Sequence, residues 1–144
     1  MLQEALAICR EAGTQFVGPM AAGALARAVE DAKSRAAALN EGQDMLSSGA
    51  VGHNHLWFYR DAIEAALSAG DGAGALIYAS ALEDYTRGEP LPWSDLFVKR
   101  GRLLARALQG IDEDIRAQLT GIRSSLERAG LKPFLPAVNA ALDK

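Results

Sequence analysis

Apolar side chains recur every three or four residues along almost the whole of this chain, and strict alternation of apolar and polar residues is nowhere sustained. Spacings of three and four place side chains on one face of an α-helix, whereas alternation is typical of a half-buried strand. The clearest example is the series Ile111, Ile115, Leu119, Ile122 and Leu126. The pattern therefore predicts an all-α protein of about seven helices.

Glycines divide this helical pattern into pieces of similar length. Glycine commonly ends a helix because it adopts the left-handed backbone conformation without a steric penalty. A repeat of thirty to forty residues made of two helices is typical of stacked helical hairpins. We therefore expect one domain over 1–144, a right-handed solenoid of antiparallel helical hairpins. Its predicted parts are a half repeat at 2–13, hairpins near 14–49, 50–88 and 89–130, and a C-terminal capping helix at 133–143.

Several helix starts can be predicted from the residues that cap them. Asp, Asn and Ser side chains accept hydrogen bonds from the free amides of a first helical turn. Asp71 is expected to cap one helix in this way, and either Asn54 or His53 to cap the helix before it. Ser94 is expected to cap a later helix, with Trp93 packing across the cap as a hydrophobic staple.

Composition excludes several classes of function. The 144 residues carry a net charge of -3 with Lys and Arg scattered among Asp and Glu, so we expect no nucleic-acid partner. No apolar run is long enough for a membrane span or has the form of a signal peptide, so we expect no membrane association. The single cysteine, Cys9, excludes an internal disulfide, and a reducing cytoplasm is the expected compartment.

The stretch VGHNHLWFYRD at 51–61 contains both histidines of the chain. A small metal-dependent or acid-base enzyme could use His53 and His55. On a helix, however, two residues that are two positions apart point about 200° away from each other, so the pair could not grip one ion together. The chain has no third histidine, and we expect neither a metal site nor another cofactor.

The same stretch predicts a binding surface. Trp57 and Arg60 fall on one helical face, and an aromatic residue on a polar face is typical of a partner site. In a solenoid the first helices of successive hairpins line one concave surface. The candidate groove residues on the first helices of two hairpins are His53, Trp57, Arg60, Asp61, Glu64, Asp95, Lys99 and Arg100. The alternative is that these side chains pair within the chain and that a neighbouring helix covers Trp57.

The first helix presents an apolar stripe with no preceding hairpin to cover it. The stripe consists of Leu2, Ala5, Leu6 and Cys9. We expect either a homodimer in which this helix packs against its copy, or a helix that folds back on its own domain as a cap.

Parts of the chain resemble two kinds of known helical repeat. The segment AALSAGDGAGALIYASALE at 65–83 resembles the tetratricopeptide pattern, in which a Gly-Asp turn is followed by Ala-Leu and then by regularly spaced small residues. The chain is also similar to the C-terminal helical-repeat region of bacterial multidomain proteins that pair a class III adenylate/guanylate cyclase domain with an ATPase domain. That similarity rests on GHNHLWFYRDAIEAAL at 52–67, ALEDYTRGEPLPWSDLFVKRGRLLA at 81–105 and FVGPMAAGALA at 16–26.

The resemblances imply a module that binds a protein or peptide and not an enzyme. A cyclase domain needs metal-binding carboxylates on a mixed sheet, and an ATPase domain needs a phosphate loop. GDGAG at 70–74 is not followed by Lys and Ser or Thr, as a phosphate loop requires. We therefore expect a non-catalytic, regulatory or scaffolding part of a cyclase-type signalling protein.

Overall fold

The computed structural model describes residues 1–13 and 16–144 and confirms the all-α class. The described residues form eight α-helices and one short 3₁₀ helix, where the sequence predicts about seven helices. They are α1 (Leu2–Ala12), α2 (Gly18–Ala28), α3 (Ala32–Ser47), α4 (His53–Ser68), α5 (Gly72–Thr86), α6 (Pro92–Ala107), α7 (Glu113–Arg128), η1 (Lys132–Phe134) and α8 (Leu135–Leu142). The first two positions of the predicted hairpin 14–49 lie outside the described residues.

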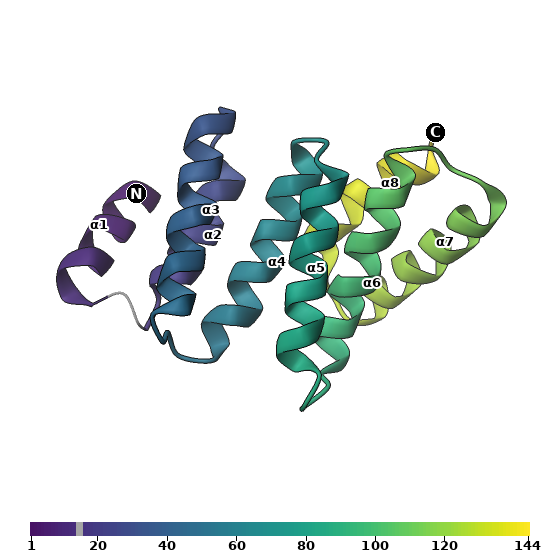
Figure 1. Cartoon of the computed structure of the whole chain (residues 1–144). Coiled ribbons are helices and arrows are strands. Elements are labelled where there is room, and N and C mark those ends of the chain that lie inside the picture. Colours follow the sequence, from purple (N-terminus) through teal and green to yellow (C-terminus); the bar gives the residue numbers. More distant parts are fainter. Residues whose placement is uncertain (14–15) are drawn as a thin grey trace.

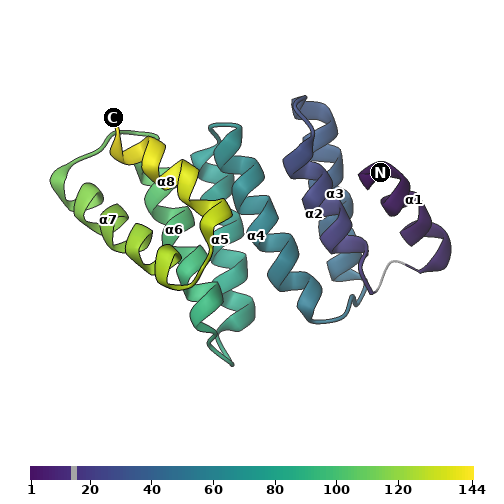
Figure 2. The same cartoon turned by 180° about the vertical axis from the view of Figure 1, so that it is seen from behind.

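The helices pack in the order in which they occur in the chain (Figures 1 and 2). Most helices pack against the next helix along the chain, and α2, α4, α6 and α8 also contact one another in sequence. Among the described residues, α3 and α5 make no direct helix-to-helix contact, although both contact α4. This missing contact leaves room between α3 and α5.

Helix ends follow the capping chemistry in several places. The carboxylate of Asp71 accepts a hydrogen bond from the Gly74 amide at 2.8 Å, which confirms its predicted role as a cap. Asp112 accepts a hydrogen bond from the Ile115 amide at 2.7 Å and caps α7 in the same way. After the C-terminal end of α4, Gly70 has a φ of 72° and closes the turn into α5.

Two predicted caps are wrong. The helix expected to begin after Ser94 starts at Pro92, since proline at the first helical position loses no hydrogen bond. The Ser94 hydroxyl donates instead to the Leu91 carbonyl at 2.9 Å, and Trp93 lies inside the first turn, so it forms no staple. The cap position of α4 is occupied by Gly52. The Asn54 side-chain amide donates hydrogen bonds to backbone carbonyls and does not cap the free amides of the first turn of α4.

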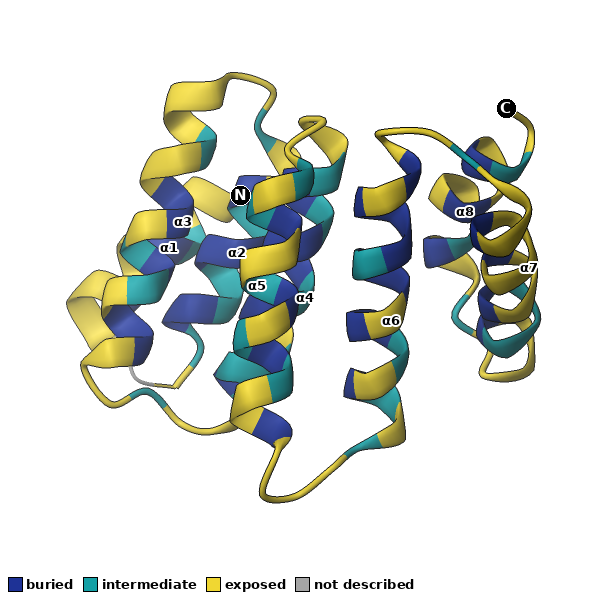
Figure 3. Ribbon diagram, turned by 45° about the vertical axis from the view of Figure 1, so that its right-hand side comes forward, coloured by how far each residue is buried: buried dark blue, intermediate teal, exposed yellow. Residues whose placement is uncertain are grey.

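The core follows the interfaces between successive helices. Figure 3 shows buried positions on the sides of the helices that face their neighbours. Phe58 of α4 and Phe97 of α6 are fully enclosed, and Leu119 of α7 extends the same cluster. Glycines allow close approach, as at Gly101, where an added Cβ would lie 2.8 Å from Cγ2 of Ile63. None of the described helices has both the length and the apolar character needed to cross a membrane.

Candidate functional site

The face on which the sequence predicts a groove contains a cluster of charges from three helices. Asp61 of α4 is buried, and its Oδ1 accepts hydrogen bonds from Arg60 at 2.7 Å and from Arg27 of α2 at 3.0 Å. The buried carboxylate is therefore paired with two cations, as a charge that is shielded from water requires.

The cluster continues on α6. Arg100 is 1% exposed, and its guanidinium forms a two-pronged ion pair with the carboxylate of Glu64 on α4. Its Nε also donates to the carbonyl of Phe134 at 3.2 Å. We call Arg27, Arg60, Asp61, Glu64 and Arg100 the charged cluster.

The C-terminal part of the chain covers this charged cluster. The Phe134 ring is buried, and its centre lies 5.6 Å from the guanidinium carbons of Arg60 and Arg100 and 5.8 Å from that of Arg27. Cations within about 6 Å of an aromatic centre are attracted to the ring's negative face. The guanidinium groups of the charged cluster are thus in contact with an aromatic side chain of the same protein.

The eight predicted groove residues do not form one open surface. Asp61 and Arg100 are buried, which corrects the expectation that they border a groove. They are buried because each forms ion pairs with other members of the charged cluster. Asp95 and Lys99 are exposed on α6. Trp57 is 37% exposed, and its ring lies 5.5 Å from the Trp93 ring of α6 and 4.5 Å from the Arg60 guanidinium. Trp57 therefore lies between two helices at the edge of the charged cluster.

The two histidines serve different neighbours. Nε2 of His53 lies 3.0 Å from the Phe16 carbonyl oxygen. The His55 ring stacks on Tyr85 with 4.1 Å between ring centres, and burial lowers the pKa of His55 below its ordinary value. Within the described ranges, no group of three or more His, Cys, Asp or Glu side chains is arranged to hold a metal ion.

The apolar stripe of α1 is turned toward its own domain at two of its four positions. Leu6 and Cys9 are buried, and Leu6 packs with Ala22 of α2 and Met45 of α3. These two residues cannot form the expected dimer contact, because the fold already covers them. Leu2 remains exposed and Ala5 is half-buried.

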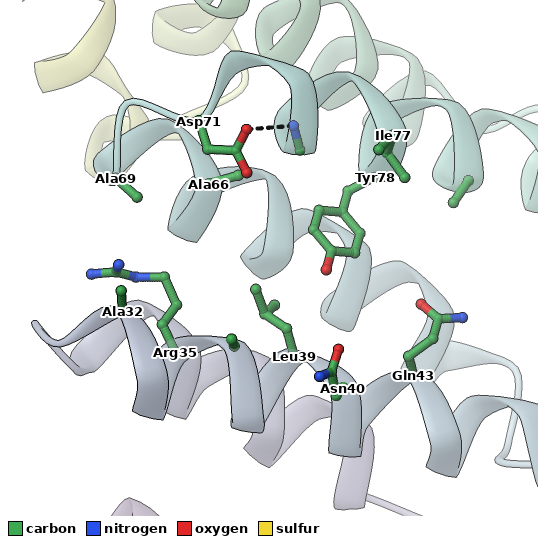
Figure 4. Close-up of a pocket in the computed structure, with 13 residues that line it drawn as sticks. Ala32, Arg35, Leu39, Asn40, Gln43, Ala66, Ala69, Asp71, Ile77 and Tyr78 are labelled. Atoms are coloured by element: carbon green, nitrogen blue, oxygen red, sulfur yellow. Dashed lines mark hydrogen bonds between the residues drawn. The ribbon is translucent and has the colours of Figure 1, made fainter.

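A groove that the sequence did not predict runs between α3 and α5. Its volume is about 790 Å³, within the range of 300–1,000 Å³ that is typical of ligand pockets. Figure 4 shows Leu39 of α3 and Tyr78 of α5 pointing into the space, and Ala66 of α4 also lines it, beside Asp71. Arg35, Asn40, Gln43 and Asp71 supply its polar edge. We call this the α3–α5 groove.

Helix α5 presents apolar side chains outside the core as well as inside it. Ile77 is 67% exposed and Leu76 is 40% exposed, while Ala75 and Leu82 on the other side are buried. A helix that is apolar all round is normally enclosed by neighbours. This pattern was visible in the sequence as GALIYASAL at 74–82 and is the signal that could have identified the groove.

The Tyr78 hydroxyl provides a polar group beside the apolar floor of this groove. In Figure 4 it points toward α3. Burial, the negative charge of Asp71 and the neighbouring Tyr59 raise the pKa of Tyr78 above its ordinary value. A protonated tyrosine hydroxyl can donate a hydrogen bond to a ligand. An apolar floor with a few polar groups at its edge is suited to binding and orienting a ligand.

Comparisons of the chain with protein-family models, with curated proteins and with solved structures find no match.

Proposed function

We propose that this chain is a non-catalytic helical-repeat module that binds a protein or peptide in the α3–α5 groove. The observation that carries the proposal is the apolar groove itself, together with the exposed Ile77 on its edge. An exposed apolar surface beside a groove is typical of an interaction site.

Sequential helix packing supports a solenoid of antiparallel helical hairpins of the tetratricopeptide-like kind. In this interpretation α2, α4 and α6 are the first helices of three hairpins, and α3, α5 and α7 are the second helices. The α3–α5 groove then lies between second helices of neighbouring hairpins. On the face of the first helices, where the sequence predicts binding, the Phe134 ring lies against the guanidinium groups of the charged cluster.

The groove is suited to an amphipathic helix. A helix of this kind binds by placing apolar side chains three and four residues apart into an apolar groove. Leu39 and Tyr78 would contact those side chains from opposite walls, while Arg35 and Gln43 would face polar positions along the edge of the ligand.

We further propose that the module belongs to a cyclase-type signalling protein, in a regulatory or scaffolding role. This rests on the similarity of 52–67 and 81–105 to the helical-repeat region described above. The coding sequence upstream of Met1 provides the check, since a cyclase domain encoded in the same reading frame would support the assignment.

The binding proposal can be tested with a displayed library of helical peptides selected against the wild-type protein. Binding of the selected peptides is then measured by calorimetry for wild type, for Ile77→Asp and for Ile8→Asp. Ile8 is a matched control because it is 58% exposed but lies on α1, away from the groove. We expect Ile77→Asp to weaken binding about tenfold or more, since a charge in an apolar contact must be desolvated, and Ile8→Asp to have no effect.

Circular dichroism on both variants verifies that the helices are intact. The proposal fails if no peptide is enriched, or if the two variants bind the selected peptides equally well.

A further inference from the structure

A second groove, between α6 and α7, has the opposite chemistry to the α3–α5 groove. Its volume is about 630 Å³, and its lining contains four cationic side chains and no carboxylate. The cations are Lys99, Arg102, Arg106 and Arg128. The groove is therefore positively charged, although the net charge of the whole chain is -3. We call this the α6–α7 groove.

Helical spacing explains the gathering. Lys99, Arg102 and Arg106 are three and four residues apart on α6, so they share one face of that helix. Arg128 approaches from the last turn of α7. Between the two helices the floor is formed in part by Leu103 and by Gly121, where an added Cβ would meet no atom within 4 Å. A ligand can therefore reach the backbone of α7 between the cations.

The cations of the α6–α7 groove are only partly neutralised by the protein. Arg102 forms a two-pronged ion pair with Glu83 of α5, with both distances 2.8 Å, and Arg106 lies 3.5 Å from Asp114. In the part of the chain that the structure describes, Lys99 and Arg128 have no carboxylate partner. Arg128 donates only to the hydroxyl of Ser125, at 3.1 Å.

We propose that the α6–α7 groove binds an acidic segment of a partner protein, independently of the α3–α5 groove. Guanidinium groups bind carboxylates in a two-pronged geometry, and Lys99 adds a point charge at one end. The apolar floor gives a place for an aliphatic side chain between the acidic residues. Charge complementarity of this kind fixes the register of a partner and accelerates its association.

An acidic protein segment fits this groove better than a nucleic acid. A duplex presents one negative charge about every 1.7 Å of its axis and needs a continuous cationic surface. Here the carboxylates of Glu83 and Asp114 lie beside the groove, so the cationic surface does not continue past them. The cationic surface is short, as expected for a few carboxylates on a peptide.

The test uses the whole protein and a fluorescein-labelled peptide of about 15 residues with glutamates and with leucine at every fourth position. Fluorescence anisotropy is measured at low and at physiological salt with wild type, with the double variant Lys99→Glu/Arg128→Glu, and with Lys33→Glu/Lys132→Glu. The last variant carries the same change in net charge at exposed positions outside the groove. Among the described residues, neither double variant removes a member of an ion pair.

We expect the peptide to bind the wild type, to bind more weakly as salt rises, and to lose about tenfold or more in affinity with Lys99→Glu/Arg128→Glu. Binding to Lys33→Glu/Lys132→Glu should remain within about twofold of the wild type. The proposal is overturned if the two double variants lose affinity equally, if the peptide does not bind, or if a single-stranded oligothymidylate binds more tightly than the peptide. Retained binding to Ile77→Asp distinguishes this groove from the α3–α5 groove.

Discussion

Gly42 of α3 lies directly against the ring of Phe58 on α4. A Cβ atom at position 42 would lie 2.7 Å from Cδ2 of Phe58 and 3.1 Å from the Cβ of Ala22 on α2. Phe58 is fully buried, so its ring has no free space into which it could move. The absence of a side chain at Gly42 therefore allows α2, α3 and α4 to meet.

We predict that Gly42→Ala lowers the free energy of unfolding by about 2 kcal/mol, because an added methyl group overpacks the contact with Phe58. Alanine normally stabilises the interior of a helix by about 1 kcal/mol relative to glycine, so the overpacking must exceed this gain. Gly121→Ala on α7 is the matched control, since its Cβ would meet nothing, and it should raise stability. Urea denaturation measures both changes, and a similar change in the two variants would disprove the packing explanation.

Arg100 and Arg102 provide a comparison between a buried and an exposed ion pair on one helix. Arg100→Ala should lower the free energy of unfolding by about 3 kcal/mol or more, because it leaves the carboxylate of Glu64 shielded from water without a cation. Arg102→Ala should cost less than about 1 kcal/mol, because both partners in its pair with Glu83 are more than a third exposed. Chemical denaturation of the two variants decides the point. Equal losses would show that burial does not control the strength of these pairs.

Trp93 is expected to stabilise the contact between α4 and α6. Its ring lies 4.6 Å from the Phe97 ring and 5.5 Å from the Trp57 ring, and it is half-buried. Trp93→Ala should therefore lower the free energy of unfolding by about 2 kcal/mol, less than the loss for a fully enclosed tryptophan. Thermal unfolding followed by circular dichroism is the measurement. A melting temperature equal to that of the wild type would rule out a stabilising role for this ring.

His55 should make stability depend on pH. Burial lowers its pKa in the folded protein below the ordinary value of 6.5, so the unfolded chain takes up the proton first as pH falls. Stability from the neutral ring is fully present above about pH 6.5 and is lost as pH falls toward the lower pKa of the folded state. His55→Gln should reduce the decrease in melting temperature between about pH 7.5 and about pH 5.5. An unchanged decrease in this variant would exclude His55 as the cause.

The helices could be predicted from the sequence because their determinants are local. Apolar spacing and the glycine stops indicated nearly every helix, and Asp71 was correctly identified as a cap. The cap at Ser94 was wrong because two residues compete for the same helix start. Pro92 can occupy the first helical turn without losing a hydrogen bond, which places Ser94 inside the helix.

The candidate site was harder to predict because it depends on contacts between distant residues. Local spacing correctly places Arg60 and Glu64 on a common face, but nothing local indicates that Phe134 covers that face. The α3–α5 groove likewise depends on the separation of two helices that do not touch. In the sequence, only the excess of apolar residues around Ile77 indicated the α3–α5 groove.

The contact between Phe134 and Arg27 joins residues from nearly opposite ends of the chain. During synthesis, α2, α4 and α6 leave the ribosome before Phe134 does. A nascent chain therefore contains Arg27, Arg60 and Arg100 before the aromatic ring that lies against them has been synthesised. Release of the segment around Phe134 is the step that closes this face.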